Sequence, residues 1–151
     1  MRVAEVMSTD VRTVTPTALA ADAWPVMRND GIHHLVVMNN AELVGVLSDR
    51  DAGGRNGAAV RANARVNELM TSAVVSVRPD ETIRKVANLM RGRTIGCVPV
   101  IDRGHVRGIV TVSDLLSVLG GATDRPARPE RRHLHYRAPH RKQRQRANRA
   151  W

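Results

Sequence analysis

The chain has 151 residues, of which 42% are apolar, so it is long enough for one ordinary domain or for two small units that share a core. Aromatic residues are scarce (two Trp, one Tyr and no Phe), which predicts an aliphatic core and excludes the aromatic platforms that read single-stranded nucleic acids. The formal net charge is +10, but residues 1–120 carry only +2 of it and residues 121–151 carry +8.

Cysteine content and hydropathy indicate the cellular compartment. The single cysteine, Cys97, has no partner for an internal disulfide, which is compatible with a reducing cytosol. No apolar run approaches the ~18 residues that a membrane-spanning helix needs. The first residues, MRVAEVMSTD, lack the apolar segment of a signal peptide. We therefore expect a cytoplasmic protein without a membrane span.

The first unit of the chain reads as a strand, a helix and a hairpin. Residues 11–16, VRTVTP, are rich in β-forming residues and stop at a proline. Residues 17–30 have helical character, and Pro25 inside them predicts a kink. Residues 32–47 are two apolar runs separated by a polar turn, which is typical of a β-hairpin.

A closing phrase, GVLSDRD at residues 45–51, ends this unit and leads towards a helix. Gly53 and Gly54 follow almost at once, so this helix is expected to be a single turn. We take residues 2–51 as the first repeat and residues 52–65, AGGRNGAAVRANAR, as a connector.

The second repeat, residues 66–120, aligns with the first at an offset of 63 residues without a gap. The identical pairs include Val3 with Val66, Glu5 with Glu68, Met27 with Met90, Gly45 with Gly108 and Asp51 with Asp114. The same order of strand, helix, hairpin and closing phrase recurs, and GIVTVSD at residues 108–114 enters a longer helix. So many identities on one diagonal indicate a tandem duplication. We expect an α/β (α+β) fold of two β-α-β-β-α repeats packed sheet to sheet as a pseudo-two-fold pair, because each copy then covers the other's apolar face.

Both copies resemble the CBS (cystathionine β-synthase) domain, and the tandem is similar to a Bateman module. The resemblance covers residues 2–120 and rests on VAEVMSTDVRTVTP, VNELMTSAVVSVRP, IHHLVVMN, IGCVPVID and the two closing phrases, which fit G-h-h-[S/T]-x-x-D. It implies two clefts between the repeats that bind an adenosine-containing effector: AMP, ADP, ATP, NAD or S-adenosylmethionine. It further implies a homodimeric sensor in signal transduction that regulates an unidentified protein partner, has no catalytic cofactor and is not an enzyme.

Three positions of each closing phrase suit a nucleotide. The hydroxyl that begins the helix is placed to contact a phosphate oxygen, and the carboxylate three residues later would accept hydrogen bonds from the ribose hydroxyls. The position between them offers a forked guanidinium in one copy and a hydroxyl in the other. These candidate ligand-binding residues are Ser48, Arg50 and Asp51 in the first repeat and Thr111, Ser113 and Asp114 in the second.

The same spacing also fits a capping box, in which the hydroxyl and the acid satisfy backbone N–H groups at a helix start. An isolated match would favour the cap. Duplication within a CBS-like frame favours a ligand site, and the same residues can serve both roles.

By the resemblance, an adenine slot is built from the first strand and the stretch around the start of the hairpin. Its positions are Val11, Ile32, His33, His34 and Val36 in the first repeat and Val74, Ile95, Gly96, Cys97 and Pro99 in the second. The two imidazoles either narrow the first slot or contact phosphate when protonated. Only the second slot keeps the family's proline, so we expect the cleft that uses it to be the better one. One cleft of the family often combines the slot of one repeat with the aspartate of the other.

Neither a metal site nor a nucleophile is expected. The adjacent histidines lack a suitably spaced third ligand, and Cys97 lacks the histidine and asparagine pattern of a cysteine nucleophile. The sequence also contains no nucleophile elbow and no P-loop. These observations favour a binding module over an enzyme.

Residues 121–151 contain ten basic residues, two acidic residues and three prolines, which predicts a disordered basic tail. Such a tail is suited to nonspecific electrostatic contact with nucleic acid, ribosomes or anionic lipid. The competing hypothesis is therefore a CBS-fold interaction protein with vestigial clefts, whose tail over residues 122–151 binds nucleic acid or another anionic partner.

Overall fold

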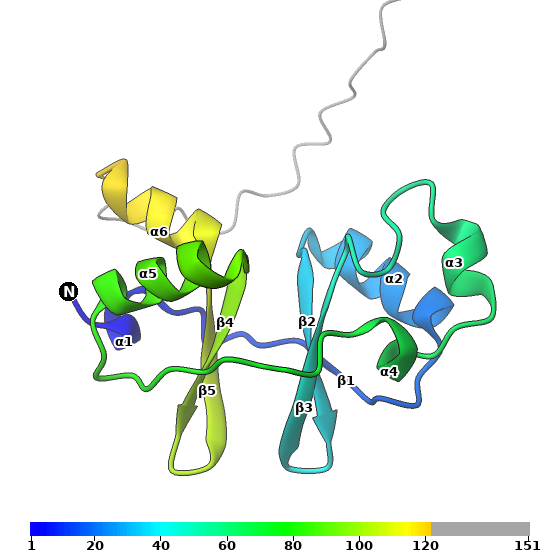
Figure 1. The fold of residues 1–151 in the computed structure, drawn as a ribbon, viewed down its shortest axis with the longest axis horizontal. Coiled ribbons are helices and arrows are strands. Elements are labelled where there is room, and N and C mark those ends of the chain that lie inside the picture. Colours follow the sequence, from blue (N-terminus) through cyan, green and yellow to red (C-terminus); the bar gives the residue numbers. More distant parts are fainter. Residues whose placement is uncertain (122–151) are drawn as a thin grey trace, which may run out of the picture.

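A computed structural model describes residues 1–121, which form two similar halves side by side (Figure 1). In each half a β-hairpin points downwards in the view and helices lie above it. The expected basic tail, beyond residue 121, lies outside the described residues. Within residues 1–121 no helix has both the length and the apolar character required to cross a membrane.

The first half contains a three-stranded sheet in the order β1-β2-β3. Strand β1 pairs in parallel with β2, and β2 pairs antiparallel with β3. Its elements are β1 (Thr13–Val14), α2 (Ala20–Asp30), β2 (His34–Asn39) and β3 (Glu42–Ser48). Helix α2 continues through Pro25 and ends at Gly31, whose φ of 63° permits the left-handed turn that leads into β2.

The second half repeats this arrangement down to its irregularities. Its elements are α5 (Ile83–Arg93), β4 (Cys97–Asp102), β5 (His105–Thr111) and α6 (Val112–Leu119). The hairpin β2–β3 has a register shift between Val37 and Met38, and β4–β5 has one between Val100 and Ile101, 63 positions further on. Helix α5 begins with the Thr82 hydroxyl accepting a hydrogen bond from the Lys85 N–H.

The expected first strand of the second repeat is reduced to one parallel bridge between Val77 and Val100. In the first repeat, the Val36 N–H donates to the Arg12 carbonyl at 3.0 Å. At the offset of 63 residues the corresponding donor is Pro99, which has no N–H, so the ladder cannot extend to Val75. The expectation of a strand was wrong here because the proline removes one of the hydrogen bonds that would define it.

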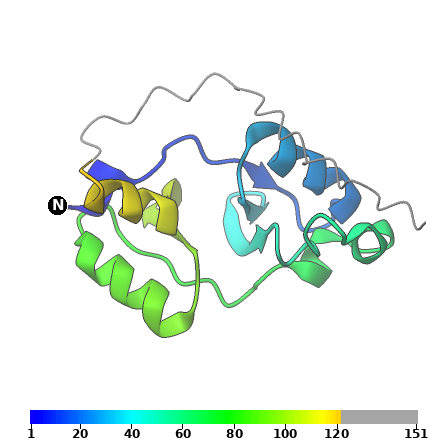
Figure 2. The same ribbon diagram turned by 90° about the horizontal axis from the view of Figure 1, so that it is seen from above.

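The two halves exchange their first helices. Helix α1 (Val3–Val6) packs against the second repeat, with the fully buried Val3 in the cluster that contains Val86 and Val98. Helix α4 (Val66–Leu69) packs against the first repeat, with Val66 in the cluster that contains Leu35 and Leu47. Figure 2 shows the two extended segments that cross between the halves as a result. Each half therefore completes the core of the other.

The stretch between the repeats, expected as a connector, contains α3 (Ala58–Ala62). The closing phrase of the first repeat is followed by a single helical turn, in which the Ala52 N–H donates to the Ser48 carbonyl at 3.1 Å. The closing phrase of the second repeat instead enters α6 directly. The expectation of one turn after the first phrase and a longer helix after the second is confirmed.

Candidate functional site

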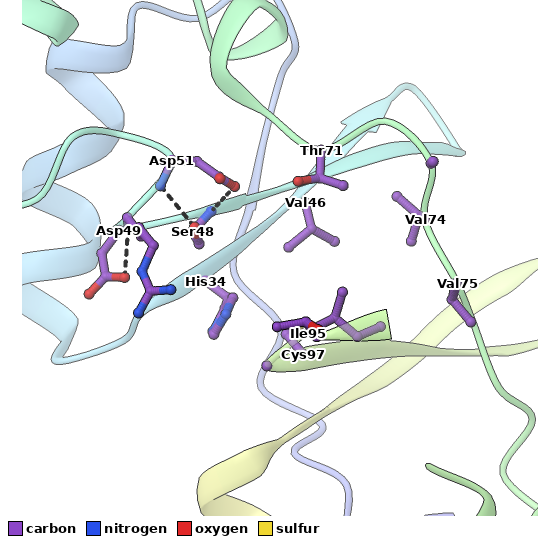
Figure 3. A pocket seen from close by; sticks show the side chains of 14 residues that line it. His34, Val46, Ser48, Asp49, Asp51, Thr71, Val74, Val75, Ile95 and Cys97 are labelled. Atoms are coloured by element: carbon purple, nitrogen blue, oxygen red, sulfur yellow. Dashed lines mark hydrogen bonds between the residues drawn. The ribbon is translucent and has the colours of Figure 1, made fainter. Parts of the chain in front are cut away.

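A cavity of about 370 Å³ lies between the end of β3 in the first repeat and the start of β4 in the second (Figure 3). This volume is in the range of small-molecule sites. Its lining residues are His34, Val46, Ser48, Asp49, Arg50, Asp51, Thr71, Ala73, Val74, Val75, Thr94, Ile95, Gly96 and Cys97. The polar groups come mainly from the first repeat, and the apolar wall comes mainly from the second.

Half of the candidate residues from the sequence line this cavity. They are His34, Ser48, Arg50 and Asp51 from the first repeat and Val74, Ile95, Gly96 and Cys97 from the second. The other candidates do not line it: Val11, Ile32, His33, Val36, Pro99, Thr111, Ser113 and Asp114. The cavity thus joins the closing phrase of one repeat to the slot of the other.

The glycine that opens each closing phrase allows a neighbouring segment to pass close to the strand. The segment after α4 crosses β3, where Val46 and Thr71 exchange N–H···O bonds of 3.0 and 2.9 Å. A Cβ atom on Gly45 would lie only 2.5 Å from the Met70 Sδ, so a side chain at residue 45 would push this segment away. The crossing carries Thr71 and Val74 over the cavity, as Figure 3 shows.

Both closing phrases form the capping box. The Ser48 N–H donates to Asp51 Oδ2 at 3.1 Å, and the Asp51 N–H donates to the Ser48 hydroxyl at 2.9 Å. Thr111 and Asp114 make the same pair of bonds at 2.8 and 3.3 Å. The capping alternative is therefore real in both repeats. In the first repeat the capped residues also line the cavity, so the capping bonds do not remove them from the candidate site.

Electrostatics make the cavity's histidine and thiol neutral groups. Burial lowers the pKa of His34, and this effect outweighs the opposing attraction of Asp49. Burial, together with the nearby Asp114 carboxylate, raises the pKa of the Cys97 thiol to about 12. Cys97 is therefore a wall residue with little thiolate character. Within residues 1–121, no three His, Cys, Asp or Glu side chains gather as a metal site would require.

A carboxylate that sequence reasoning did not select, Asp49, lies at the cavity's polar end. Its Oδ2 accepts a hydrogen bond from His33 Nδ1 at 2.9 Å, and its Oδ1 accepts one from the Arg50 N–H at 2.8 Å. Burial acts to raise the pKa of Asp49, but these hydrogen bonds outweigh it and lower the pKa below its ordinary value. His33 thus contacts the site indirectly, through Asp49.

Six lining residues were absent from the sequence-based candidates: Val46, Asp49, Thr71, Ala73, Val75 and Thr94. Two of them could have been found, because Asp49 lies inside the closing phrase and Val75 is next to Val74. Thr71 and Ala73 lie at the cavity only because the segment after α4 crosses β3, and no local sequence pattern predicts that crossing.

The second slot has a smaller residue and one fewer backbone hydrogen bond than the first slot. His33 of the first repeat corresponds to Gly96 of the second, where an added Cβ would make only ordinary contact with the His34 ring. In the first slot the Val36 N–H donates a hydrogen bond to the Arg12 carbonyl. In the second slot Pro99 has no N–H, so the corresponding hydrogen bond to Val75 cannot form. The observed cavity uses the second slot.

Comparison with known proteins identifies the class. The family model of the CBS domain matches residues 3–52 and 66–121, and the chain therefore belongs to the CBS domain family. The CBS domain-containing protein YhcV of Bacillus subtilis is 31% identical over 114 residues, which cover 75% of this chain and 81% of that protein.

Two further relatives place the match in context. A homoserine O-acetyltransferase of Methanohalobium evestigatum is 34% identical over 115 residues, 75% of this chain but only 23% of the enzyme. Among solved structures, the CBS domain pair of protein MJ0100 in complex with 5′-methylthioadenosine and S-adenosyl-L-methionine has a TM-score of 0.73. It is 27% identical, and the match covers 81% of this chain and 98% of that one. The fold is therefore that of a CBS domain pair.

Proposed function

We propose that the chain is a non-catalytic regulatory module that binds an adenosine-containing ligand in this cavity and signals the bound state to a protein partner. The ligand belongs to the set AMP, ADP, ATP, NAD and S-adenosylmethionine. The observation that carries the proposal is the junction of Asp51 with the apolar wall of Val74, Ile95 and Cys97 in one cavity. Adenosine matches this arrangement, because its base has apolar faces suited to the wall and its ribose diol is suited to Asp51.

Each part of the ligand has a matching group. The adenine fits the wall of Val74 and Ile95, and Val75 beside them receives no backbone hydrogen bond from Pro99, which has no N–H. The ribose diol suits Asp51, whose capping bond engages only Oδ2 of its two oxygens. The 5′ substituent then points towards Ser48, Asp49 and Arg50.

The comparisons support the ligand class. The CBS domain pair of protein MJ0100, with the same fold, was crystallised with two adenosine derivatives. The homoserine O-acetyltransferase match covers only about a quarter of that enzyme, so the acetyltransferase name does not suggest an activity for this chain. We propose a cytoplasmic protein that is not an enzyme.

The module is proposed to act as a homodimer. Helix α6 supports this, because Val112, Leu116 and Leu119 follow one another at helical spacing and are 42%, 61% and 83% exposed. An exposed apolar stripe of this kind is typical of association surfaces.

Calorimetry with AMP, ATP, NAD and S-adenosylmethionine tests the binding proposal. Asp51→Ala is expected to weaken binding at least about tenfold, because it removes charge-assisted hydrogen bonds to the ribose. Asp114→Ala is the matched control: it removes the same capping box from the other repeat, yet is expected to leave affinity within about twofold. Absence of binding by all four ligands would refute the proposal, as would equal losses in the two variants.

The second candidate function rests on the charge of residues 122–151, which hold ten basic and two acidic residues. A CBS-fold protein with vestigial clefts would use this segment for nonspecific nucleic-acid binding, and such binding would be salt-sensitive. It would survive Asp51→Ala/Asp114→Ala but not deletion of residues 122–151.

A further inference from the structure

The cavity's polar end has an unusual charge balance for a nucleotide site. Among the described residues, its lining contains two carboxylates, Asp49 and Asp51, against one guanidinium, that of Arg50. Arg50 is exposed, so solvent screens its attraction for an anion. Phosphate sites generally gather several cations or N–H donors around the anion.

His34 does not correct this balance. Its ring lines the same cavity, and burial lowers its pKa, which keeps it uncharged at neutral pH. The imidazole therefore offers a hydrogen bond and a surface, but no positive charge.

The carboxylate of Asp49 is fixed in place. His33 Nδ1 holds one oxygen at 2.9 Å and the Arg50 N–H holds the other at 2.8 Å. These bonds hold the side chain in one orientation at the polar end of the cavity. The backbone N–H of Arg50, a donor that could have met a phosphate oxygen, is already engaged by this carboxylate.

The backbone N–H groups of Ser48 and Asp51, which could also bind an anion, are likewise engaged in hydrogen bonds. The Ser48 N–H donates to Asp51, and the Asp51 N–H donates to the Ser48 hydroxyl. Only a single helical turn follows, so no extended helix points its amino end at the cavity from this phrase. A 5′ phosphate would therefore meet two carboxylates and few unoccupied N–H donors.

We infer, on the basis of the proposed function, that the cavity selects adenosine derivatives whose 5′ substituent is neutral or cationic, such as a thioether or a sulfonium, over adenosine 5′-phosphates. Asp49 is the specificity-determining residue. A sulfonium ion next to its carboxylate gains attraction, whereas each phosphate adds repulsion.

Calorimetry on the full-length chain at neutral pH and physiological salt tests this inference with four probes of graded charge. These are S-adenosylmethionine, 5′-methylthioadenosine, AMP and ATP. The probes with an uncharged or cationic 5′ group are expected to bind at least about tenfold more tightly than ATP, with AMP between them. Each negative charge on the 5′ group adds repulsion from the Asp49 carboxylate, which solvent screens only in part.

Asp49→Asn is expected to tighten AMP binding about threefold and to weaken S-adenosylmethionine, while 5′-methylthioadenosine changes little. Glu42→Gln is the matched control, because it also removes one negative charge, at the opposite end of β3 from Ser48. It is expected to leave all four affinities unchanged.

The outcomes separate the two proposals. Binding of AMP or ATP as tightly as 5′-methylthioadenosine would overturn this inference and leave the proposed function intact. Equal effects of Asp49→Asn on all four probes would also overturn it. Failure of all four probes and of NAD to bind would overturn both.

Discussion

The guanidinium of Arg61 lies 3.9 Å from the centre of the Trp24 ring, while its Nη1 donates hydrogen bonds to the carbonyls of Ala52 and Gly54. Arg61 is only 6% exposed, so a charged side chain from the stretch between the repeats is packed into the first half. Through these bonds α3 holds the turn that follows Asp51. The stretch is thus part of the structure that positions the cavity.

Arg61→Leu is expected to lower the free energy of unfolding by about 2–4 kcal/mol, because the buried Ala52 carbonyl and the part-buried Gly54 carbonyl lose their donor and the Trp24 ring loses its cation. Urea denaturation followed by circular dichroism measures the change. Arg28→Leu is the control: its guanidinium lies 5.7 Å from the same ring in an exposed position, and a change below about 0.5 kcal/mol is expected. Similar losses in both variants would contradict a special role for Arg61.

Gly45→Ala and Gly108→Ala are each expected to destabilise the protein by about 1–3 kcal/mol, because both positions are overpacked by a methyl group. The added carbon would lie 3.0 Å from the Thr71 carbonyl oxygen in the first case and 2.8 Å from the Ser8 carbonyl oxygen in the second. Thermal unfolding measures the effect.

Gly92→Ala is expected to change the stability in the opposite direction, measured by the same thermal unfolding experiment. Gly92 lies inside α5, where a Cβ added to it would have nothing within 4 Å, so alanine is expected to stabilise by about 0.5–1 kcal/mol. Destabilisation by all three substitutions would argue against close approach as the cause.

Stability is expected to fall on mild acidification because of His34. Its pKa is lowered from 6.5 in the folded chain, so the unfolded chain binds more protons between the lowered value and 6.5. The stabilisation is fully present above pH 6.5 and is lost as the pH falls through this window. Urea denaturation at a series of pH values measures the slope, which His34→Gln should reduce; an unchanged slope would rule out His34 as its source.

Deletion of residues 122–151 is expected to leave ligand affinity within about twofold, since all the lining residues of the cavity precede residue 98. The same deletion should abolish any salt-dependent retention on DNA–cellulose, because it removes a net charge of +8. Loss of ligand binding on deletion would instead assign the tail a part in the site.

Leu116→Lys/Leu119→Lys is expected to convert the proposed homodimer to a monomer, because two charges then interrupt the apolar stripe of α6. Sedimentation velocity measures the mass before and after. Arg84→Ala, a substitution on the neighbouring helix α5, is the control. A dimer that persists in the double variant would place its interface elsewhere.

The duplication made much of the site predictable. One offset of 63 residues predicted the paired hairpins, and the closing phrases predicted the capped Ser48 and Asp51 at the cavity. The missing strand also has a visible sequence cause, since Pro99 replaces the donor supplied by Val36 in the other copy. The positions at which the repeats differ were therefore as informative about the structure as the positions that they share.

Long-range packing was the unpredictable part. The burial of Val3 in one half and Val66 in the other depends on which core each apolar helix face meets, and local periodicity is the same for either choice. Thr71 and Ala73 reach the cavity as a result of that choice. Asp49 could be located from the closing phrase, but its hydrogen bond with His33, a residue on a different strand boundary, could not.

The exchange of α1 and α4 means that neither repeat contains the whole of its own core. A ribosome-bound chain must therefore present Val66 before the first half can close, and the second half recruits a helix that was synthesised before the first half. Two separate single-repeat chains could make the same exchange only at their bulk concentration. Fusion into one chain replaces that concentration with a much higher effective one, which favours the paired state without adding a single contact.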